Sequence, residues 1–183
     1  MRLLAVLSAA AVLAAAAGPG AAVAQATSPA SCVWEKLPKQ KRDELQVIYD
    51  RSLDEGLQAF LFTEVELNDA YKSCGVQGSD EIGKALGSYE IEVMMTDWLA
   101  RNYGVTRAGL NAAWVAAAPT VRLAVPLPDG AERTRTVETV LGKAAEAAGI
   151  PEADRVPGPA MTRLALYLLN RGRREAIELA AHI

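Results

Sequence analysis

The sequence has very few of the residues on which most enzyme and metal sites depend. Its 183 residues include one histidine, two cysteines and two phenylalanines. A histidine-rich metal or haem site is therefore excluded. A Ser-His-acid triad would have to use His182, which lies next to the end of the chain on a turn that is prone to fray.

The usual phosphate-binding and nucleophile motifs are also missing. The chain has neither the G-x-x-x-x-G-K-[ST] loop that cradles nucleotide phosphates nor the G-x-S-x-G elbow found in many hydrolases. The glycines of GVQGSDEIG, residues 75–83, follow no strand pattern, which a dinucleotide site would require. We therefore expect the protein to use no cofactor.

The chain has no excess of basic residues. Its 19 lysines and arginines are outnumbered by 22 aspartates and glutamates, and the formal net charge is −3. Nucleic acids and anionic lipids are bound mainly through basic surfaces. We therefore expect no nucleic-acid partner and no anionic lipid as the main partner.

Residues 1–26 have the build of a secretory signal peptide. A positively charged start precedes the apolar stretch 3–17, which the Gly-Pro-Gly of residues 18–20 interrupts. Two A-x-A sites predict cleavage after Ala24 or Ala26. An uncleaved anchor is the alternative, but a helix needs roughly 20 uninterrupted apolar residues to cross a bilayer. We expect a periplasmic or secreted protein with no stable membrane insertion after cleavage.

The two cysteines, Cys32 and Cys74, predict one structural disulfide, because thiols pair in oxidising compartments. A lipid anchor on Cys32 is disfavoured because this residue lies well beyond the apolar stretch. A redox pair usually needs a C-x-x-C spacing, and a zinc site needs further cysteine or histidine ligands. Thiol or metal chemistry would therefore require that both thiols are free.

Apolar residues recur at helical spacing along the mature chain, which predicts an all-α fold. Residues 121–125 alternate as in a strand, but no second strand-like segment would pair with them. We expect a compact orthogonal or irregular bundle of about five to seven helices. It would form a single helical domain over residues 27–183, with any subdivision near 119–130, where prolines cluster.

Capping residues predict where the helices begin and end. The predicted starts are Pro38, Thr63, Ser79, Thr106 and Pro159, and the predicted ends are Gly75, Gly104 and Gly149. Residues TSPAS, just before Cys32, are expected to form a loose segment. The helix that contains Trp114 is expected to end before Pro119.

The helix of residues 79–104 should be central, because apolar residues cover two of its sides. Gly83 and Gly87 lie one turn apart, and their missing side chains would let a neighbouring helix approach closely. Any groove left beside these glycines is a candidate contact surface.

Carboxylates are the only plausible catalytic groups. The candidates that lie close to apolar residues are Glu64, Glu66, Glu90, Glu92 and Asp97. Positions i and i+2 of a helix point in different directions, so the two Glu pairs are not ready-made acid/base dyads. Glu90 or Asp97 is the better candidate, because burial raises the pKa of a carboxylic acid. A solvated helix face is the simpler interpretation for each of them.

A second candidate contact surface is basic and lies on the last helix. Its members are Arg163, Arg171, Arg173 and Arg174, which could meet an acidic partner or an anionic cell-wall polymer. The simpler interpretation is that they complement the negative end of the helix and cover its exposed face. Met94 and Met95 could bind Cu(I), but adjacent helical side chains diverge by about 100°. We expect both to be core residues and the protein to hold no metal.

Together these patterns predict an exported helical protein that acts by binding or as a structural accessory. Its partner would be an unidentified protein or a component of the cell envelope. The alternative is a carboxylate-dependent hydrolase of an envelope polymer. A cleft with two convergent acids of raised pKa would favour that alternative, whereas dispersed acids would favour binding.

Overall fold

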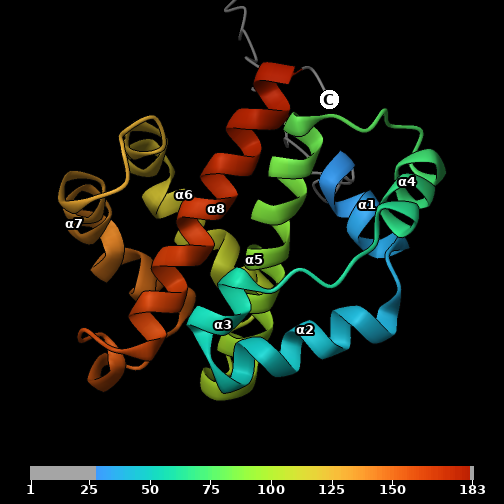
Figure 1. Cartoon of the computed structure of the whole chain (residues 1–183). Helices are drawn as coiled ribbons and strands as arrows, with labels where there is room; N and C mark the ends of the chain where they lie inside the picture. The colour runs from blue at the N-terminus through green and yellow to red at the C-terminus, as the bar shows by residue number, and fades with distance from the viewer. Residues whose placement is uncertain (1–27, 182–183) are drawn as a thin grey trace, which may run out of the picture.

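The computed structural model describes residues 28–181, and all regular structure within that range is helical (Figure 1). Eight α-helices and one short 3-10 helix follow one another: α1 (Pro29–Lys36), α2 (Lys39–Arg51), α3 (Leu53–Gln58), α4 (Glu64–Ser73), α5 (Asp80–Tyr103), α6 (Arg107–Ala124), α7 (Ala131–Ala148), η1 (Glu152–Asp154) and α8 (Pro159–Ala181). The predicted all-α class is confirmed. The predicted signal peptide, residues 1–26, lies outside the described residues.

The described range has more helices than the sequence predicted, for two reasons. Residues 29–31, which were expected to be loose, form the first turn of α1, because the Ser28 side chain accepts a hydrogen bond from the backbone of Ser31 and proline is well placed in the first turn. Ser52 also splits the first long helical pattern. Its backbone is extended and its side chain caps a separate helix, α3.

Most other predicted boundaries are confirmed. Thr63 and Glu66 form a complete capping box at α4, and Thr106 caps α6. Gly104 and Gly149 end α5 and α7 in the left-handed conformation that glycine adopts without strain.

The predicted helix end before Pro119 is wrong, since α6 continues to Ala124. Proline removes one backbone hydrogen bond from a helix, which leaves the carbonyl four residues earlier without its usual donor. Here Pro119 and Val115 both lie on the exposed side of α6, where water can reach that carbonyl.

α5 and α8 pack against each other at the centre of the molecule, with α6 and α7 on one side and α1 and α4 on the other (Figure 1). The two central helices are antiparallel, because Glu92 and Trp98 of α5 meet Arg174 and Arg163 of α8 in reversed order. The largest fully buried side chains come from most of the helices: Val33, Leu37, Leu45, Ile82, Met94, Met95, Leu99, Leu110, Val121, Ile150, Leu164 and Leu168. None of the helices within residues 28–181 is long and apolar enough to cross a membrane.

The predicted disulfide is present. Cys32 in α1 is bonded to Cys74, the residue that ends α4, and their Cα atoms are 5.9 Å apart. Neither cysteine is free, so the pair offers no thiol for redox or metal chemistry. The bond ties the start of the described chain to the helix that precedes α5.

Candidate functional site

A pocket of about 320 Å³ lies where α2, α3 with the residues after it, α5 and α8 meet. Its lining residues are Tyr49, Leu57, Ala59, Phe60, Lys84, Gly87, Ser88, Glu90, Ile91, Asn170 and Arg173. We refer to it as the Glu90 pocket. It combines one acidic, two basic and several apolar side chains.

The hollow beside α5 exists partly because Gly87 has no side chain. A Cβ atom placed on Gly87 would find no atom of a neighbouring element within 4 Å, and the same is true of Gly83. The prediction that these glycines admit a close neighbouring helix is therefore wrong. Gly87 instead faces open space and lines the pocket, which is the groove beside α5 that the sequence allowed for.

Close helix approach occurs at other glycines. A Cβ on Gly109 of α6 would lie 2.6 Å from the carbonyl oxygen of Ala148, at the end of α7. A Cβ on Gly172 of α8 would lie 3.1 Å from side-chain carbons of Val121 and Val125. The G-x-x-x-G spacing thus pointed to the wrong pair, since spacing alone does not say which face of a helix meets a neighbour.

Glu90 is the buried polar group of the pocket, with 8% of its surface exposed. Its Oε1 accepts one hydrogen bond, of 3.3 Å, from the hydroxyl of Tyr49 on α2. Burial raises the pKa of Glu90 to about 7, although the bond from Tyr49 acts in the opposite direction. Burial, and then the charge of Glu90, raise the pKa of Tyr49, so this phenol stays protonated and can donate.

No lysine or arginine within residues 28–181 forms an ion pair with Glu90. Buried charges in proteins are normally paired, because removing an ion from water is costly. Glu90 is therefore a carboxyl group that the described fold supplies with a hydrogen bond but not with a counter-charge.

The mouth of the pocket is basic and apolar. Lys84 is exposed on α5, and Arg173 of α8 is about half exposed, with its nearest carboxylate oxygen 3.9 Å away on Asp129. Phe60 and Leu57 are the apolar members, and 66% of the Phe60 surface is exposed. The pocket therefore combines a buried acid, Glu90, with two exposed basic side chains and the aromatic ring of Phe60.

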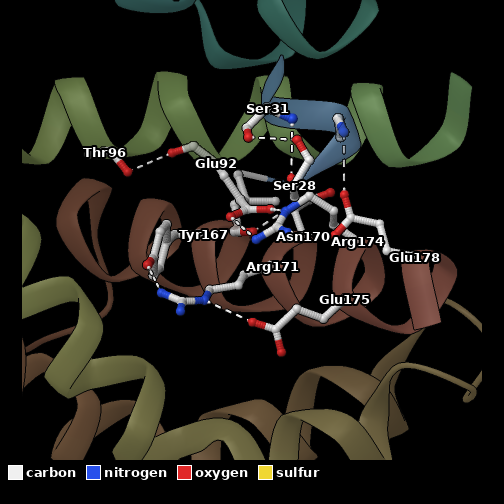
Figure 2. Close-up of polar contacts among 12 residues, drawn as sticks. Ser28, Ser31, Glu92, Thr96, Tyr167, Asn170, Arg171, Arg174, Glu175 and Glu178 are labelled. Carbon is white, nitrogen blue, oxygen red and sulfur yellow. Dashed lines mark hydrogen bonds and ion pairs between the residues drawn. The ribbon is translucent and has the colours of Figure 1, made fainter. Parts of the chain in front are cut away.

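Glu92 lies only two positions from Glu90 but makes entirely different contacts. Figure 2 shows it facing Arg174 of α8, whose Nε donates to its Oε1 at 2.6 Å and whose second terminal nitrogen donates to its Oε2 at 3.2 Å. Burial lowers the pKa of Arg174, but the hydrogen bond and the charge of Glu92, together with those of Glu178, outweigh it and raise that pKa above its usual value. This is a buried ion pair that joins the central helices.

The same network extends to α1 and along α8. Glu178 accepts hydrogen bonds from Arg174 at 2.9 Å and from the backbone nitrogen of Ala30 at 3.4 Å. Figure 2 also shows Arg171 between Tyr167 and Glu175. The contact between Glu178 and Ala30 joins α8 to α1, whereas the contacts of Arg171 with Tyr167 and Glu175, and of Arg174 with Glu178, lie within α8.

The four arginines of the predicted basic surface therefore have different surroundings. The guanidinium of Arg163 lies 3.8 Å from the centre of the Trp98 ring, and Arg171 and Arg174 are mostly buried in the network of Figure 2. Arg173 is the most exposed of the four arginines, and it lines the Glu90 pocket. An interaction surface formed by all four arginines stays a prediction.

The other candidate acids do not converge on the Glu90 pocket. Glu64 is exposed, and Glu66 takes part in the capping box and pairs with Lys41 at 2.7 Å. Asp97 and Glu92 both line a shallow hollow of about 160 Å³ beside Arg107. Within that hollow, both oxygens of Glu92 are already bonded to Arg174.

A larger groove, of about 720 Å³, separates α7 from α8 and is mostly apolar. Its main side chains are Val137, Leu141, Met161, Leu166 and Leu169, with Arg155 and Glu138 as its charged members. The described residues do not show what would cover it, and it contains no buried polar group.

No metal site is evident in the described range. Residues 28–181 contain no cluster of three or more His, Cys, Asp or Glu side chains that could hold an ion. Met94 and Met95 are both buried in the core, as the sequence predicted. His182 lies outside the described residues.

Sequence reasoning named three of the pocket residues, Gly87, Glu90 and Arg173, but not as one site. Lys84, Gly87 and Glu90 recur every three positions and so share a face of α5, a signal that could have linked them. Tyr49, Phe60 and Asn170 join them only through tertiary packing.

Comparison with known proteins identifies no relative of this chain. No family model, no curated protein and no solved structure matches the chain.

Proposed function

We propose that this is an exported, non-enzymatic binding protein of the cell envelope, periplasmic or secreted, which holds a small ligand in the Glu90 pocket. One observation carries the proposal: a carboxyl group that is nine-tenths buried borders a cavity and has no cationic partner. Such a group takes up a proton, as its raised pKa reflects, unless a positive charge lies beside it. A ligand is the simplest source of it. Export is supported by the leader-like residues 1–26 and by the disulfide.

Binding is favoured over catalysis because the pocket has one acid. Hydrolysis of a glycosidic bond normally needs two carboxyl groups on either side of the bond. Among the described residues that line the pocket, Glu90 is the only carboxylate.

The proposal is tested with a variant that fills the pocket and a matched variant that does not. Gly87→Leu places a side chain in the open space of the pocket, whereas Gly83→Leu places the same side chain in open space one turn away, outside the lining. Neither substitution creates a backbone clash, and leucine favours the helix more than glycine does.

A panel of small molecules would be screened by thermal shift against the wild type and both variants. We expect at least one compound to raise the Tm of the wild type and of Gly83→Leu, but not that of Gly87→Leu. Equal responses of all three proteins, or no response from any compound, would contradict the proposal.

The second candidate function, hydrolysis of an envelope polymer, has one observation in its favour. Asp97 and Glu92 line the same hollow, and burial raises the pKa of Asp97 while the charge of Arg101 opposes it. If this pair were catalytic, Asp97→Asn would abolish the release of soluble fragments from purified peptidoglycan. We expect no release above background by the wild type or by Asp97→Asn, because both carboxylate oxygens of Glu92 accept hydrogen bonds from Arg174.

A further inference from the structure

We infer that the ligand of the Glu90 pocket is a dipeptide with apolar side chains, bound through both of its charged ends. The inference rests on the proposed function and names the ligand class for the same site. It follows from the order of charges along the pocket, from the apolar wall and from the size of the cavity.

The inner end of the pocket calls for a cation with hydrogen-bond donors. Glu90 accepts a single hydrogen bond, from Tyr49, and no lysine or arginine of the described chain pairs with it. A primary ammonium group carries one positive charge and three donors. The amino terminus of a peptide would therefore supply the charge that Glu90 lacks.

The outer end of the pocket calls for an anion. Lys84 on α5 and Arg173 on α8 are the two basic side chains of the lining, and both are exposed. Arg173 is only weakly engaged, because Asp129 lies 3.9 Å away and is itself paired with Arg133. A carboxylate is the group that a guanidinium and an ammonium hold best together.

The distance between these two ends fits a dipeptide. Lys84 precedes Glu90 by six positions on α5, which corresponds to roughly 9 Å along the helix axis. Two extended residues span about 7 Å, and the lysine side chain can cover the remainder.

The side walls are apolar. Phe60, Leu57 and Ile91 are apolar members of the lining, and the Phe60 ring is exposed enough to cover a bound side chain. Removing an apolar ligand side chain from water against such a wall favours binding. Leucine-like side chains suit this wall better than polar ones.

The titratable and charged groups that face the pocket are Tyr49 on α2, Lys84 and Glu90 on α5, and Arg173 on α8. The pKa of Glu90 is about 7, so its charge changes between about pH 6 and about pH 8. The ammonium group needs the ionised form. A peptide α-amino group has a pKa of about 7.7–8.0 and is partly uncharged at about pH 8, so the affinity should be about three- to fivefold lower at about pH 6 than at about pH 8.

The test is isothermal titration calorimetry on the full exported protein with three matched ligands. Leu-Leu has both charged ends, N-acetyl-Leu-Leu lacks the ammonium, and Leu-leucinamide lacks the carboxylate. We expect Leu-Leu to bind at about pH 8 and each blocked peptide to bind at least about tenfold more weakly. Gly83→Leu should behave as the wild type and Gly87→Leu should not bind.

Two conservative variants assign the ends. Glu90→Gln should weaken Leu-Leu binding at least about tenfold at about pH 8 and remove the loss of affinity at about pH 6, while Leu-Leu and N-acetyl-Leu-Leu become nearly equal. Arg173→Gln should instead make Leu-Leu and Leu-leucinamide nearly equal. Circular dichroism spectra and Tm values of both variants would show that they remain folded.

Three results would overturn the inference: equal binding of N-acetyl-Leu-Leu and Leu-Leu by the wild type, unchanged affinity in Glu90→Gln, or no binding of Leu-Leu at all. If Gly87→Leu still abolished binding of some other compound, the dipeptide assignment would fall and the binding function would stand. If Gly87→Leu blocked no ligand, both the dipeptide assignment and the proposed binding function would be contradicted.

Discussion

At the residue scale, Glu90 stands out because the fold stabilises its protonated form. The unfolded chain would release the proton near the ordinary pKa of 4.5, whereas the folded protein keeps it until about pH 7. As pH rises between these values, only the unfolded state gains from ionisation, so the free energy of unfolding falls. Above about pH 7 both states are ionised and the loss is complete.

The corresponding prediction is that Glu90→Gln stabilises the protein in alkaline but not in acidic buffer. A shift of this size corresponds to about 3 kcal/mol at most. We expect the variant to exceed the wild type by about 1–3 kcal/mol at about pH 8 and to match it at about pH 4.5. Urea unfolding at the two pH values measures this difference.

Glu146→Gln, at an exposed position of α7, is the control and should show no such pH-dependent gain. A Glu90→Gln protein that is no more stable than the wild type at about pH 8 would show that the buried carboxyl carries no ionisation cost.

The glycines give a second prediction at this scale, since their surroundings differ so much. Gly109→Ala would place a Cβ atom 2.6 Å from a backbone carbonyl oxygen of α7, so α6 and α7 would have to move apart. We expect a loss of about 1–3 kcal/mol in the free energy of unfolding. Gly83→Ala, in open space, should gain about 0.5–1 kcal/mol from reduced chain entropy. Urea unfolding of both variants tests the contrast, which the opposite order would contradict.

At the scale of elements, the ion pair between Glu92 and Arg174 fastens α5 to α8. Removing one partner leaves a buried charge alone, which typically costs about 3–5 kcal/mol. Arg174→Met should therefore lower the free energy of unfolding by about that amount. Adding Glu92→Leu should recover most of the loss, because two apolar side chains can replace a buried pair.

A double-mutant cycle measured by urea unfolding gives the coupling directly. A wild-type stability in Arg174→Met, or no recovery in the double variant, would mean that the pair does not hold the two helices together.

The sequence correctly predicted the helix boundaries that are marked by local capping residues. The capping box at Thr63 and the glycines at positions 104 and 149 correctly marked ends of helices, because caps depend on a few neighbouring residues. The helix α1 was missed because a short Pro- and Ser-containing segment looks like a loop. Its stability comes from a single serine cap, from the disulfide and from burial of Val33 and Trp34.

The prediction that the helix ends before Pro119 was wrong because it, too, ignored tertiary surroundings. A proline interrupts a helix only if the freed carbonyl finds no other partner, and that depends on which side of the helix faces water. The periodicity around Trp114 could have indicated the exposed side, since Ala117 and Ala118 continue its buried stripe up to the proline and Val121 and Ala124 continue it beyond.

At the scale of the whole molecule, the disulfide links parts of the chain that are 42 residues apart. In the chain-entropy model, closing a loop of this length destabilises the unfolded state by about 4 kcal/mol. We expect the double variant Cys32→Ser, Cys74→Ser to lose about that much, measured by urea unfolding. An unchanged midpoint would show that the cross-link does not constrain the unfolded chain.

The candidate site belongs to the same scale, which is why the sequence revealed only parts of it. Gly87 and Glu90 were singled out on α5, and Arg173 on α8, but their proximity depends on the antiparallel packing of these helices. The contribution of Phe60 depends on the turn that follows α3. Neither the packing of α5 against α8 nor the path of the chain after α3 can be read from a local sequence pattern.

The most direct test of the account is to map the ligand site on the whole molecule. Backbone amide NMR shifts of the exported protein would be followed during a titration with Leu-Leu at about pH 8, a pH at which Glu90 is mostly ionised. If the Glu90 pocket binds the dipeptide, the largest changes fall in residues 57–60, 84–91 and 170–173, and Gly87→Leu abolishes them. Changes concentrated on α7 and the groove beside it, or no changes at all, would contradict the assignment of the Glu90 pocket as the binding site.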